Sequence, residues 1–445
     1  MKRAMAEYVD VFYENIRIAR IAKTDAGPAL VYEDAWRSRK AAFPISLSMP
    51  LAESGHGGRT IMPWLANLLP ESHLHEIGQI MGVHSQDVLG ILSRMGRDTA
   101  GALSIGQPRG SGGRLVPIET EADFERVIDD LPERPFLVGT EGVSMSLAGA
   151  QDKIAVSVAA GTICIPLEGE PSTHILKPDI PRLKGSVQNE AFCLTLAGMC
   201  GLETAKVTTG KAGARSYLLV ERYDRLKDAG GQVRRIHQED LAQVLGYYPV
   251  QKYETPPPGS MVGPGPGLKQ LFAAVADHVS PGERLKLLDG LIFNVLACNT
   301  DAHAKNYSLM IGARGTAKLA PLYDIMCGEV WPTITKHMAQ RIGERSEAVH
   351  IRGDDWKKLA AEVGLNPAAT LRRVAELCEL VREHVSAAKD AVAAMPAGGN
   401  QILDNVEHEV LKRVRRISNQ LGTVPRMHAE SGEPPESATS TAFDR

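Results

Sequence analysis

The feature that most constrains the fold is a short polar loop, residues 299–306, enclosed by apolar segments in the last third of the chain. The run before it, residues 287–297, is mostly apolar, as in a buried helix. The segment after it, residues 307–320, has the composition of two strands joined by a glycine-containing turn. The loop, the hairpin and the end of its second strand should bring four polar side chains to one place: Asp301, His303, Asn306 and Asp324.

Two carboxylates, an amide and an imidazole form a set that suits a metal-bound phosphate. A divalent metal on phosphates takes hard oxygen ligands, which Asn306 and Asp324 can supply. Asp301, at the head of the loop, could accept a proton from an attacking hydroxyl, and His303 could donate to a phosphate oxygen. Protein kinases divide the work in this way. A polar loop in which Asp and Asn only cap turns would contain the same residues, so the spacing alone leaves both interpretations open.

The composition is that of an ordinary globular protein. The chain has 445 residues, enough for two or three domains, with 43% hydrophobic and 23% charged residues. Its net charge of -3 gives no sign of autonomous nucleic-acid binding, which favours a basic balance. The six cysteines lack C-x-x-C spacing, so zinc and disulfide frameworks are not expected. Because there is no apolar run of membrane length and no apolar signal core near the N-terminus, we expect a cytoplasmic protein.

The patterns divide the chain into four parts. Strand-like segments in residues 9–33 and 45–51, followed by a helical stretch from Pro63, indicate a small α+β module. Residues 108–117 are glycine-rich and should form a connecting loop, and helical patterns dominate from Gln238 onward. The tail is rich in Pro, Ser, Glu and Thr and should be disordered. The expected parts are 1–107, 108–235, 236–421 and 422–445.

The second part contains candidate nucleotide-binding residues. The small residues from Leu147 to Gln151 enter a strand, and such a loop lets backbone N–H groups approach an anion. The run matches neither common phosphate-loop motif, and a plain tight turn has the same composition. Lys177, at the end of a strand, could neutralise nucleotide phosphates or be a solvated surface residue. Glu190, near the start of a helix, could pair with Lys177 or reflect only the acidic preference of a first turn.

A strand from Ser216 to Glu221 leads into a polar corner. In a two-lobed nucleotide-binding fold this segment would be the hinge, with its backbone against adenine and Tyr223 near the base. An edge strand with flanking charges is equally consistent with the pattern.

Taken together, these segments resemble the HipA family of bacterial toxin kinases. The matching segments are 45–51, 67–71, 96–103, 146–153, 173–177, 220–225, 238–240, 301–306 and 323–325. The resemblance implies an α+β, two-lobed protein-kinase-like fold, related to phosphoinositide kinases, with an N-terminal α+β subdomain and a mostly helical C-terminal lobe. The D-x-H-x-x-N spacing is closer to the lipid-kinase form of the loop.

The resemblance also implies site roles. Asp301 is the expected catalytic base, and Asn306 and Asp324 are the expected ligands of Mg2+. Lys177 is expected at the phosphates of ATP, with His303 near the γ-phosphate. The remaining expected ATP contacts are the adenine-side residues Glu221 and Tyr223 and the backbone of Leu147, Ala148, Gly149, Ala150 and Gln151.

Ser146 matches the serine that the family autophosphorylates. A phosphate on this residue adds close to two negative charges where the phosphates of ATP must lie. Repulsion between these charges should expel the loop and switch the enzyme off. Ser144, two residues earlier, could share or replace this role.

By the same resemblance, the chain would be a growth-arresting serine/threonine kinase neutralised by a helix-turn-helix antitoxin of the HipB kind. Operator DNA would be bound mainly through that antitoxin. Family substrates include aminoacyl-tRNA synthetases, but the sequence does not identify the target here. Two other functions stay open: a phosphoinositide-like or small-molecule kinase, and a nucleotide-binding co-repressor without turnover.

Overall fold

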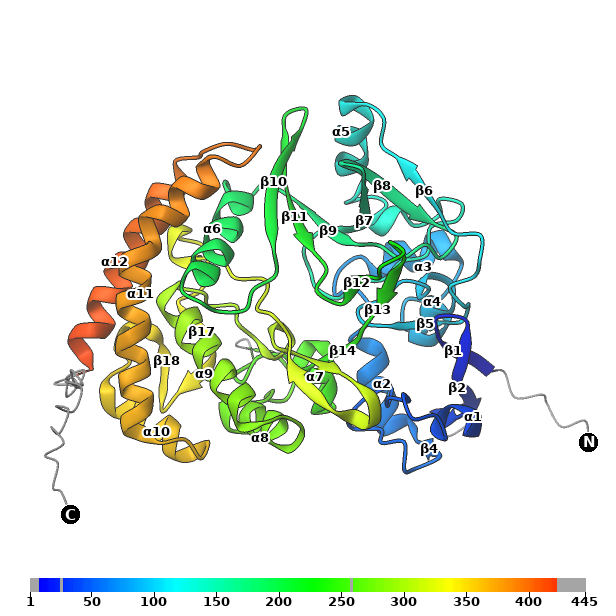
Figure 1. Ribbon diagram of the computed structural model, residues 1–445, viewed down its shortest axis with the longest axis horizontal. Coiled ribbons are helices and arrows are strands. Elements are labelled where there is room, and N and C mark those ends of the chain that lie inside the picture. The colour runs from blue at the N-terminus through cyan, green and yellow to red at the C-terminus, as the bar shows by residue number, and fades with distance from the viewer. Residues whose placement is uncertain (1–7, 25–26, 257–258, 422–445) are drawn as a thin grey trace, which may run out of the picture.

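The structure, a computed structural model, describes residues 8–24, 27–256 and 259–421. The predicted disordered tail, residues 422–445, lies outside these ranges. The chain passes from an N-terminal subdomain, through a central sheet, to a helical lobe on the opposite side (Figure 1). Within the described ranges, no helix combines the length and the apolar character that crossing a membrane requires.

The N-terminal subdomain is an antiparallel sheet covered by short helices. Its strands, in the spatial order β4-β3-β2-β1-β5, are β1 (Tyr8–Tyr13), β2 (Ile16–Thr24), β3 (Gly27–Tyr32), β4 (Gly55–His56) and β5 (Leu103–Ile105). Its helices are α1 (Asp34–Arg37), α2 (Gly58–Ala66), α3 (Leu74–Met81) and α4 (Val88–Met95). β1 and β2 pair antiparallel, and Val11, Ile18 and Ile21 in them are fully buried. The apolar residues of the strand-like segments therefore fix which face packs on the helices.

The central sheet forms the N-lobe. In the spatial order β10-β11-β9-β7-β8-β6, it consists of β6 (Arg114–Pro117), β7 (Ile154–Ala159), β8 (Thr162–Leu167), β9 (His174–Pro178), β10 (Val207–Ala212) and β11 (Arg215–Glu221). Helix α5 (Glu121–Asp130) lies near its upper end, and α6 (Ser186–Met199) connects β9 to β10. Buried residues occur on every side of α6, from Val187 to Ala197, because the sheet and the helical lobe enclose it.

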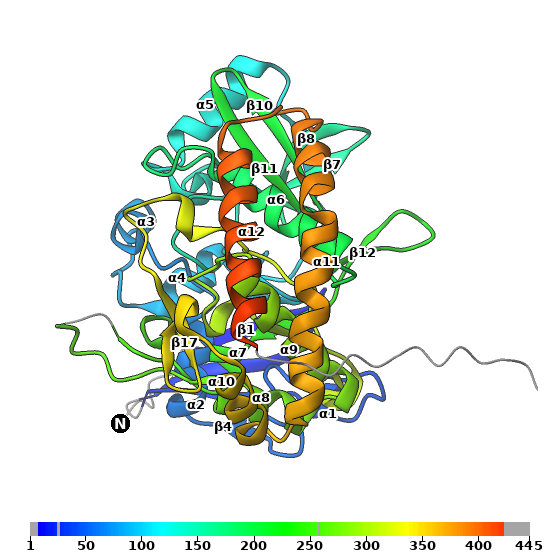
Figure 2. The same cartoon turned by 90° about the vertical axis from the view of Figure 1, so that its left-hand side faces the viewer.

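The C-terminal lobe is mostly helical. Its helices are α7 (Leu241–Val244), α8 (Leu268–His278), α9 (Pro281–Leu296), α10 (Gly353–Glu362), α11 (Pro367–Ala393) and α12 (Ile402–Gln420). Its strands are β14 (His237–Asp240), β15 (Ser308–Ile311) and β16 (Ala317–Leu319) in one sheet, and β17 (His337–Ile342) with β18 (Arg345–Glu347) in another. Helices α11 and α12 run side by side on the face of the molecule that is turned to the viewer in Figure 2. The predicted buried helix and hairpin around the polar loop are therefore α9, β15 and β16.

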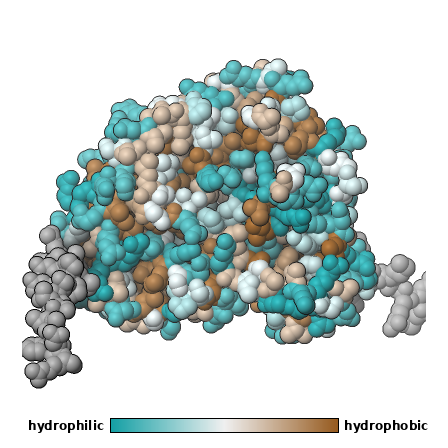
Figure 3. Space-filling model, viewed as in Figure 1, coloured by the Kyte–Doolittle hydropathy of each residue, from teal (hydrophilic) through white to brown (hydrophobic). Residues whose placement is uncertain are grey.

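Two hydrophobic cores lie beneath these elements. One core continues from the N-terminal subdomain into β7 and β9, and the other fills the helical lobe and includes α6. In the view of Figure 3, hydrophilic residues cover much of the surface, and hydrophobic residues show as patches between them. The shared first core means that the N-terminal subdomain and the central sheet are packed as one body.

A buried ionic network also joins the N-terminal subdomain to the hinge, next to the ribbon of β12 (Arg225–Lys227) and β13 (Val233–Arg235). Arg225 donates to Asp98 at 2.6 Å, and Arg222 donates to Asp224 at 2.8 Å. Burial alone would raise the pKa of Asp98, but Arg225 and Arg222 together hold it well below its usual range. Because Asp98 and Asp224 each pair with both arginines, the buried charges form one connected network that fixes the hinge relative to the subdomain.

Three local predictions were wrong. Residues 45–51 form no strand: Met49 N–H donates to the Ser46 carbonyl at 2.9 Å, and the resulting turn directs Leu47 N–H to Glu239 at 2.7 Å. The helix expected from Pro63 begins at Gly58, because the chain continues helically through this proline. The loop expected over residues 108–117 ends in an exposed edge strand, β6, paired with β8. The four-part division of the chain stays a prediction.

Candidate active site

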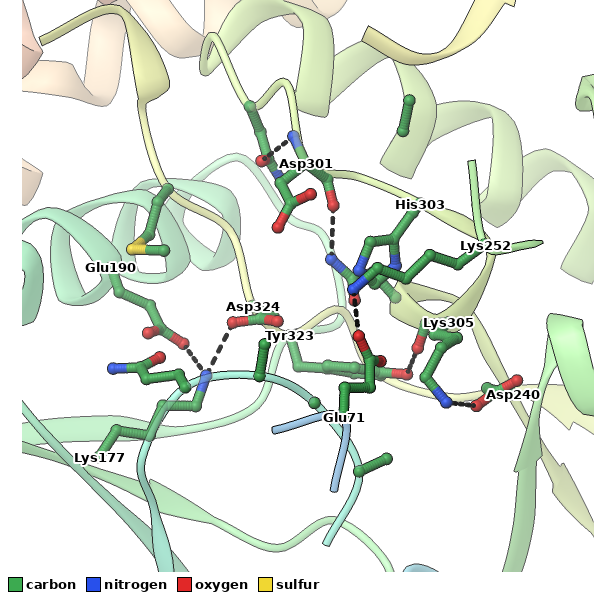
Figure 4. Close-up of a pocket in the computed structure, with 18 of the residues that line it drawn as sticks. Glu71, Lys177, Glu190, Asp240, Lys252, Asp301, His303, Lys305, Tyr323 and Asp324 are labelled. Atoms are coloured by element: carbon green, nitrogen blue, oxygen red, sulfur yellow. Dashed lines mark hydrogen bonds and ion pairs between the residues drawn. The ribbon is translucent and has the colours of Figure 1, made fainter. Parts of the chain in front are cut away.

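A cavity of about 1370 Å³ lies between the central sheet and the loops of the C-terminal lobe. The predicted site residues that line it are Leu147, Ala148, Gly149, Ala150, Gln151, Lys177, Glu221, Tyr223, Asp301, His303, Asn306 and Asp324. Part of this set is shown in Figure 4. Ser144 and Ser146 are not among the residues that line the cavity.

Lys177 lines the cavity, and its ammonium group lies between two carboxylates (Figure 4). Its Nζ donates to Glu190 on α6 at 2.7 Å and to Asp324 after β16 at 2.8 Å. The side chain of Glu190 is 3% exposed, whereas that of Asp324 is 35% exposed. Burial would lower the pKa of Lys177, but the two carboxylates more than offset this effect and raise it. Lys177 is therefore a fixed cation facing the cavity.

Asp324 and Asn306 present oxygen atoms to the same cavity. Asp324 has a φ of +58°, a left-handed backbone conformation that non-glycine residues rarely adopt and that often occurs at functional sites. Burial would raise its pKa, but Lys177 and Lys153 hold it well below its usual range, so the carboxylate is ionised. Asn306 donates its amide N–H to the Asp301 carbonyl at 2.8 Å, which leaves the amide oxygen for another partner.

These two donors fit one hard cation. A carboxylate and an amide oxygen are the kind of protein ligands that magnesium takes when phosphates and water supply the rest of its shell. In the described part of the chain, no group of three or more His, Cys, Asp or Glu side chains could hold a metal by itself. The residues therefore suit a metal that arrives with a phosphate ligand.

Asp301 opens onto the cavity from the head of the catalytic loop, which we define as residues 299–306. Its backbone N–H donates to Asn299 at 3.1 Å, and its carboxylate accepts a hydrogen bond from the Tyr253 hydroxyl at 2.5 Å. Surrounding protein raises the pKa of Asp301 by limiting its solvation, and the Tyr253 hydrogen bond and the Lys252 charge oppose this rise. A carboxylate with a raised pKa is a stronger base than an ordinary aspartate.

His303 is buried at the back of the cavity. Burial and the nearby Lys252 ammonium lower its pKa well below the usual value, so the imidazole is neutral near pH 7. Its Nδ1 makes no hydrogen bond within the described residues. The ring meets Tyr253 edge to face, with 5.3 Å between centroids. A neutral imidazole in this position can still donate one hydrogen bond toward a ligand.

The phosphate loop, residues 147–151, is held at three successive carbonyl groups. Glu71 N–H donates to Gly149 at 3.1 Å, Ser72 donates to Ala150 at 3.0 Å, and Lys153 donates to Ala148 at 2.6 Å. These bonds direct the carbonyl oxygens toward protein donors, which lessens their repulsion of an anion. Gly149 has a φ of +107°, and a Cβ there would lie 2.5 Å from the Lys153 ammonium. The loop therefore needs glycine at this position.

The predicted hinge residues also face the cavity. Glu221 is exposed at the end of β11, where its N–H donates to the Lys206 carbonyl at 2.8 Å. Tyr223 stacks on Tyr323 with 5.9 Å between ring centroids, and its hydroxyl donates to Gln238. Stacked aromatic side chains beside a strand end are suited to the flat face of a base.

The two predicted phosphorylation sites differ in accessibility. Ser146 is fully buried, and its hydroxyl donates to the Leu68 carbonyl of the N-terminal subdomain at 2.7 Å. Ser144 is half-buried, donates to the Arg94 carbonyl at 3.0 Å and accepts from Arg97 N–H at 3.3 Å. Both serines therefore anchor the loop to the N-terminal subdomain.

Sequence reasoning missed three lysines of the site. Lys252 donates to Glu71 at 2.6 Å beside His303, as Figure 4 shows. Lys305 donates to Asn67 at 2.6 Å and to Asp240 at 3.1 Å, so it joins the catalytic loop to the N-terminal subdomain. Lys153, which contacts the phosphate loop, has a pKa lowered to about 8 by burial and by Lys177. Lys153 and Lys305 lie within the motif segments, whereas no local pattern marks Lys252.

Comparisons with known proteins agree on one family. Two family models match the chain, "HipA N-terminal domain" over residues 9–106 and "HipA-like C-terminal domain" over residues 145–387. Y4mE of Sinorhizobium fredii, a kinase by provisional name, is 38% identical over 366 residues, which cover 80% of this chain and 85% of that protein. The serine/threonine-protein kinase toxin HipA of Shewanella oneidensis is 28% identical over 413 residues, which cover 89% of this chain and 91% of that protein.

A solved structure has the same fold. It is a complex of Shewanella oneidensis HipA with HipB and operator DNA, similar to this chain with a TM-score of 0.80 at 24% identity. The match covers 93% of this chain and 98% of the solved one. The expected α+β, kinase-like fold with an N-terminal subdomain and a helical C-terminal lobe is confirmed.

Proposed function

Because this chain belongs to the HipA family, we propose that it is an ATP-dependent protein serine/threonine kinase and the toxin of a toxin–antitoxin pair. One observation carries the proposal: Lys177 bridges Glu190 at 2.7 Å and Asp324 at 2.8 Å, in the same cavity as Asp301. A strand lysine paired with a helix glutamate, opposite a loop aspartate, is the arrangement that active protein kinases require.

Each side chain would have a separate task. Asp301 would accept the proton of the acceptor hydroxyl, because it is a cavity-facing carboxylate with a raised pKa. Lys177, oriented by Glu190, would neutralise negative charge on the phosphates of ATP. His303 would donate to a γ-phosphate oxygen from its neutral ring.

The loop backbone and the hinge would hold the nucleotide. Residues 147–151 would cradle the phosphates, and Glu221 and Tyr223 would border the adenine. Asn306 and Asp324 would hold magnesium, since both offer hard oxygen atoms to the cavity. When bound, magnesium neutralises charge that develops on the transferred phosphoryl group.

We propose Ser146 as the inactivating autophosphorylation site. Its hydroxyl is fully buried against the Leu68 carbonyl, so a phosphate with close to two charges does not fit the observed position. The phosphate loop would have to leave the cavity to accommodate it, and ATP would lose its cradle. A phosphate on the half-buried Ser144 could point to solvent, which makes it a weaker switch.

We also propose a helix-turn-helix antitoxin of the HipB kind as partner. The structure of Shewanella oneidensis HipA, which contains HipB and operator DNA, supports this proposal. A net charge of -3 fits a chain that leaves most DNA contacts to its partner. The substrate would be a protein, and an aminoacyl-tRNA synthetase is the candidate that the family resemblance supplies.

The test is phosphoryl transfer by the purified chain. With magnesium and radiolabelled ATP, we expect label on Ser146, located by mass spectrometry. Asp301→Asn should reduce the rate by on the order of 10²–10⁴, the usual contribution of a general base. Asp277→Asn, which changes an exposed residue of α8, is the matched control and should leave the rate unchanged. Undiminished labelling by Asp301→Asn would refute the assignment, and ATP binding without turnover would favour the co-repressor.

A further inference from the structure

The Tyr253 hydroxyl makes the hydrogen bond to Asp301 that the hydroxyl of an acceptor would make during phosphoryl transfer. Tyr253 donates to the Asp301 carboxylate at 2.5 Å, within the range of strong hydrogen bonds to a charged acceptor. Its ring lies edge to face with His303, and the residue lines the cavity. In phosphoryl transfer, the hydroxyl that donates to the catalytic-loop aspartate is that of the acceptor.

We propose that Tyr253 is a placeholder for the acceptor, whose hydroxyl must displace the Tyr253 hydroxyl from Asp301 before phosphate is transferred. This inference rests on the proposed kinase activity and adds a positioning residue to it. The tyrosine keeps the base hydrogen-bonded while no acceptor is present. An acceptor must supply a hydroxyl that takes over the hydrogen bond to Asp301. Tyr253 therefore selects for acceptors that reach far enough into the cavity to contact Asp301.

The contacts around Tyr253 restrict how it can move. On one side, Lys252 is bonded to Glu71, and its carbonyl accepts from Ala304 N–H at 3.1 Å. On the other side, Glu254 N–H donates to the Ala339 carbonyl at 3.0 Å. With the backbone held at both neighbours, the hydroxyl can leave Asp301 by rotation of the side chain alone. The cavity of about 1370 Å³ offers space for that rotation.

The charges that face Asp301 come from several elements. They are Lys252 beside it, Asp324 after β16 and Glu71 of the N-terminal subdomain, together with Tyr253 as hydrogen-bond donor. Loss of the tyrosine hydroxyl removes the hydrogen bond that competes with the acceptor and leaves these charges in place. The acceptor should then bind more tightly at an unchanged rate of transfer, which the loss of a purely structural residue would not produce.

The experiment compares Tyr253→Phe with the unaltered chain in a transfer assay. The acceptors are a synthetic peptide of residues 140–153 of this chain and dephosphorylated casein, at saturating magnesium and ATP. We expect kcat/KM for both acceptors to rise about tenfold, as loss of one competing charged hydrogen bond allows. Tyr248→Phe, at an exposed tyrosine outside the cavity, is the control and should change nothing.

The split between KM and kcat separates displacement from simple support of the base. If the acceptor displaces Tyr253, the variant lowers KM for both acceptors and leaves kcat unchanged. A fall in kcat would mean that Tyr253 stays on Asp301 during transfer and would overturn the proposal.

Two further results make the test decisive. Incorporation of 3-fluorotyrosine at position 253 strengthens the donor, so kcat/KM should fall; this second variant keeps the proposal testable if Tyr253→Phe folds poorly. Phosphate on Tyr253 in mass spectra would overturn the proposal, because the residue would then be an acceptor. Absence of any Asp301-dependent transfer would instead refute the kinase activity on which the inference rests.

Discussion

Lys177→Met removes the cation between Glu190 and Asp324 and keeps most of the side-chain length. Lys177 is bonded to Glu190 at 2.7 Å and to Asp324 at 2.8 Å. Because Glu190 is 3% exposed and Asp324 is 35% exposed, water can solvate Asp324 but not Glu190 after the change. The cost of losing the cation therefore falls mainly on Glu190.

Two estimates of this cost agree. Removing one partner of a buried ion pair costs about 3–5 kcal/mol. Protonation sets an upper limit, since neutralising a carboxyl of ordinary pKa near 4.3 at pH 7 costs about 3.7 kcal/mol. We expect Lys177→Met to lower the free energy of unfolding by about 3 to 3.7 kcal/mol at pH 7.

The pH dependence of the lost stability follows from the direction in which the pKa of Glu190 shifts. Burial already raises this pKa, and Lys177 lowers it, so the variant raises it further above the unfolded value. A group with a raised folded-state pKa is tolerated at low pH and destabilises increasingly as pH rises toward that pKa. At pH 5.5 the cost of protonating a carboxyl of ordinary pKa, which sets the upper limit, falls to about 1.6 kcal/mol. Acidification should therefore recover more than half of the lost stability.

The assay is guanidinium denaturation followed by circular dichroism at pH 7 and pH 5.5. Adding Glu190→Gln to Lys177→Met should restore most of the stability and remove its pH dependence, but phosphoryl transfer should stay on the order of 10² below that of the unaltered chain or lower. Lys211→Met on β10, at an exposed position of the same sheet, is the control. A loss that is independent of pH, or a double variant as unstable as the single one, would refute the reasoning.

Two other variants test the surroundings of the site. Gly149→Ala places a Cβ 2.5 Å from the Lys153 ammonium at a φ of +107°. Calorimetry should therefore show roughly tenfold weaker ATP binding, with an unchanged circular dichroism spectrum. Unaltered affinity would contradict the description of the loop. Lys305→Met leaves Asp240 buried without its cation, and guanidinium denaturation should show a loss of about 3 kcal/mol, compared with none for the exposed Lys211→Met.

The sequence was most informative where chemistry is local. The loop from Asp301 to Asn306 lies between an apolar helix and a hairpin, and both periodicities could be recognised from neighbouring residues. Asp324 could be placed because it follows the second strand of that hairpin by only a few residues. Lys177 and Glu190 could only be suggested as a pair, and their 2.7 Å bond needed the packing of α6 against β10 and β11 of the central sheet.

What escaped prediction depends on contacts between distant segments. Lys252 and Glu71 are 181 residues apart, and neither belongs to a periodic pattern that would place it in the cavity. Tyr253 reaches Asp301 from a segment that reads as an ordinary connection. The strand expected over residues 45–51 had suitable composition, but its backbone turns to bond the buried Glu239, and tertiary contact overrode the local preference.

The N-terminal subdomain contacts the loops of the candidate site at several points, among them Leu68 on Ser146, Glu71 on Gly149 and Lys252, and Asn67 on Lys305. A fragment beginning after residue 107 would lack the part of the cavity wall that Asn67, Glu71 and His73 supply, so the proposed activity should be lost even if the fragment folded. A substitution in the N-terminal subdomain at one of these contacts must therefore remain compatible with the loops of the candidate site, and the reverse holds for substitutions in the loops.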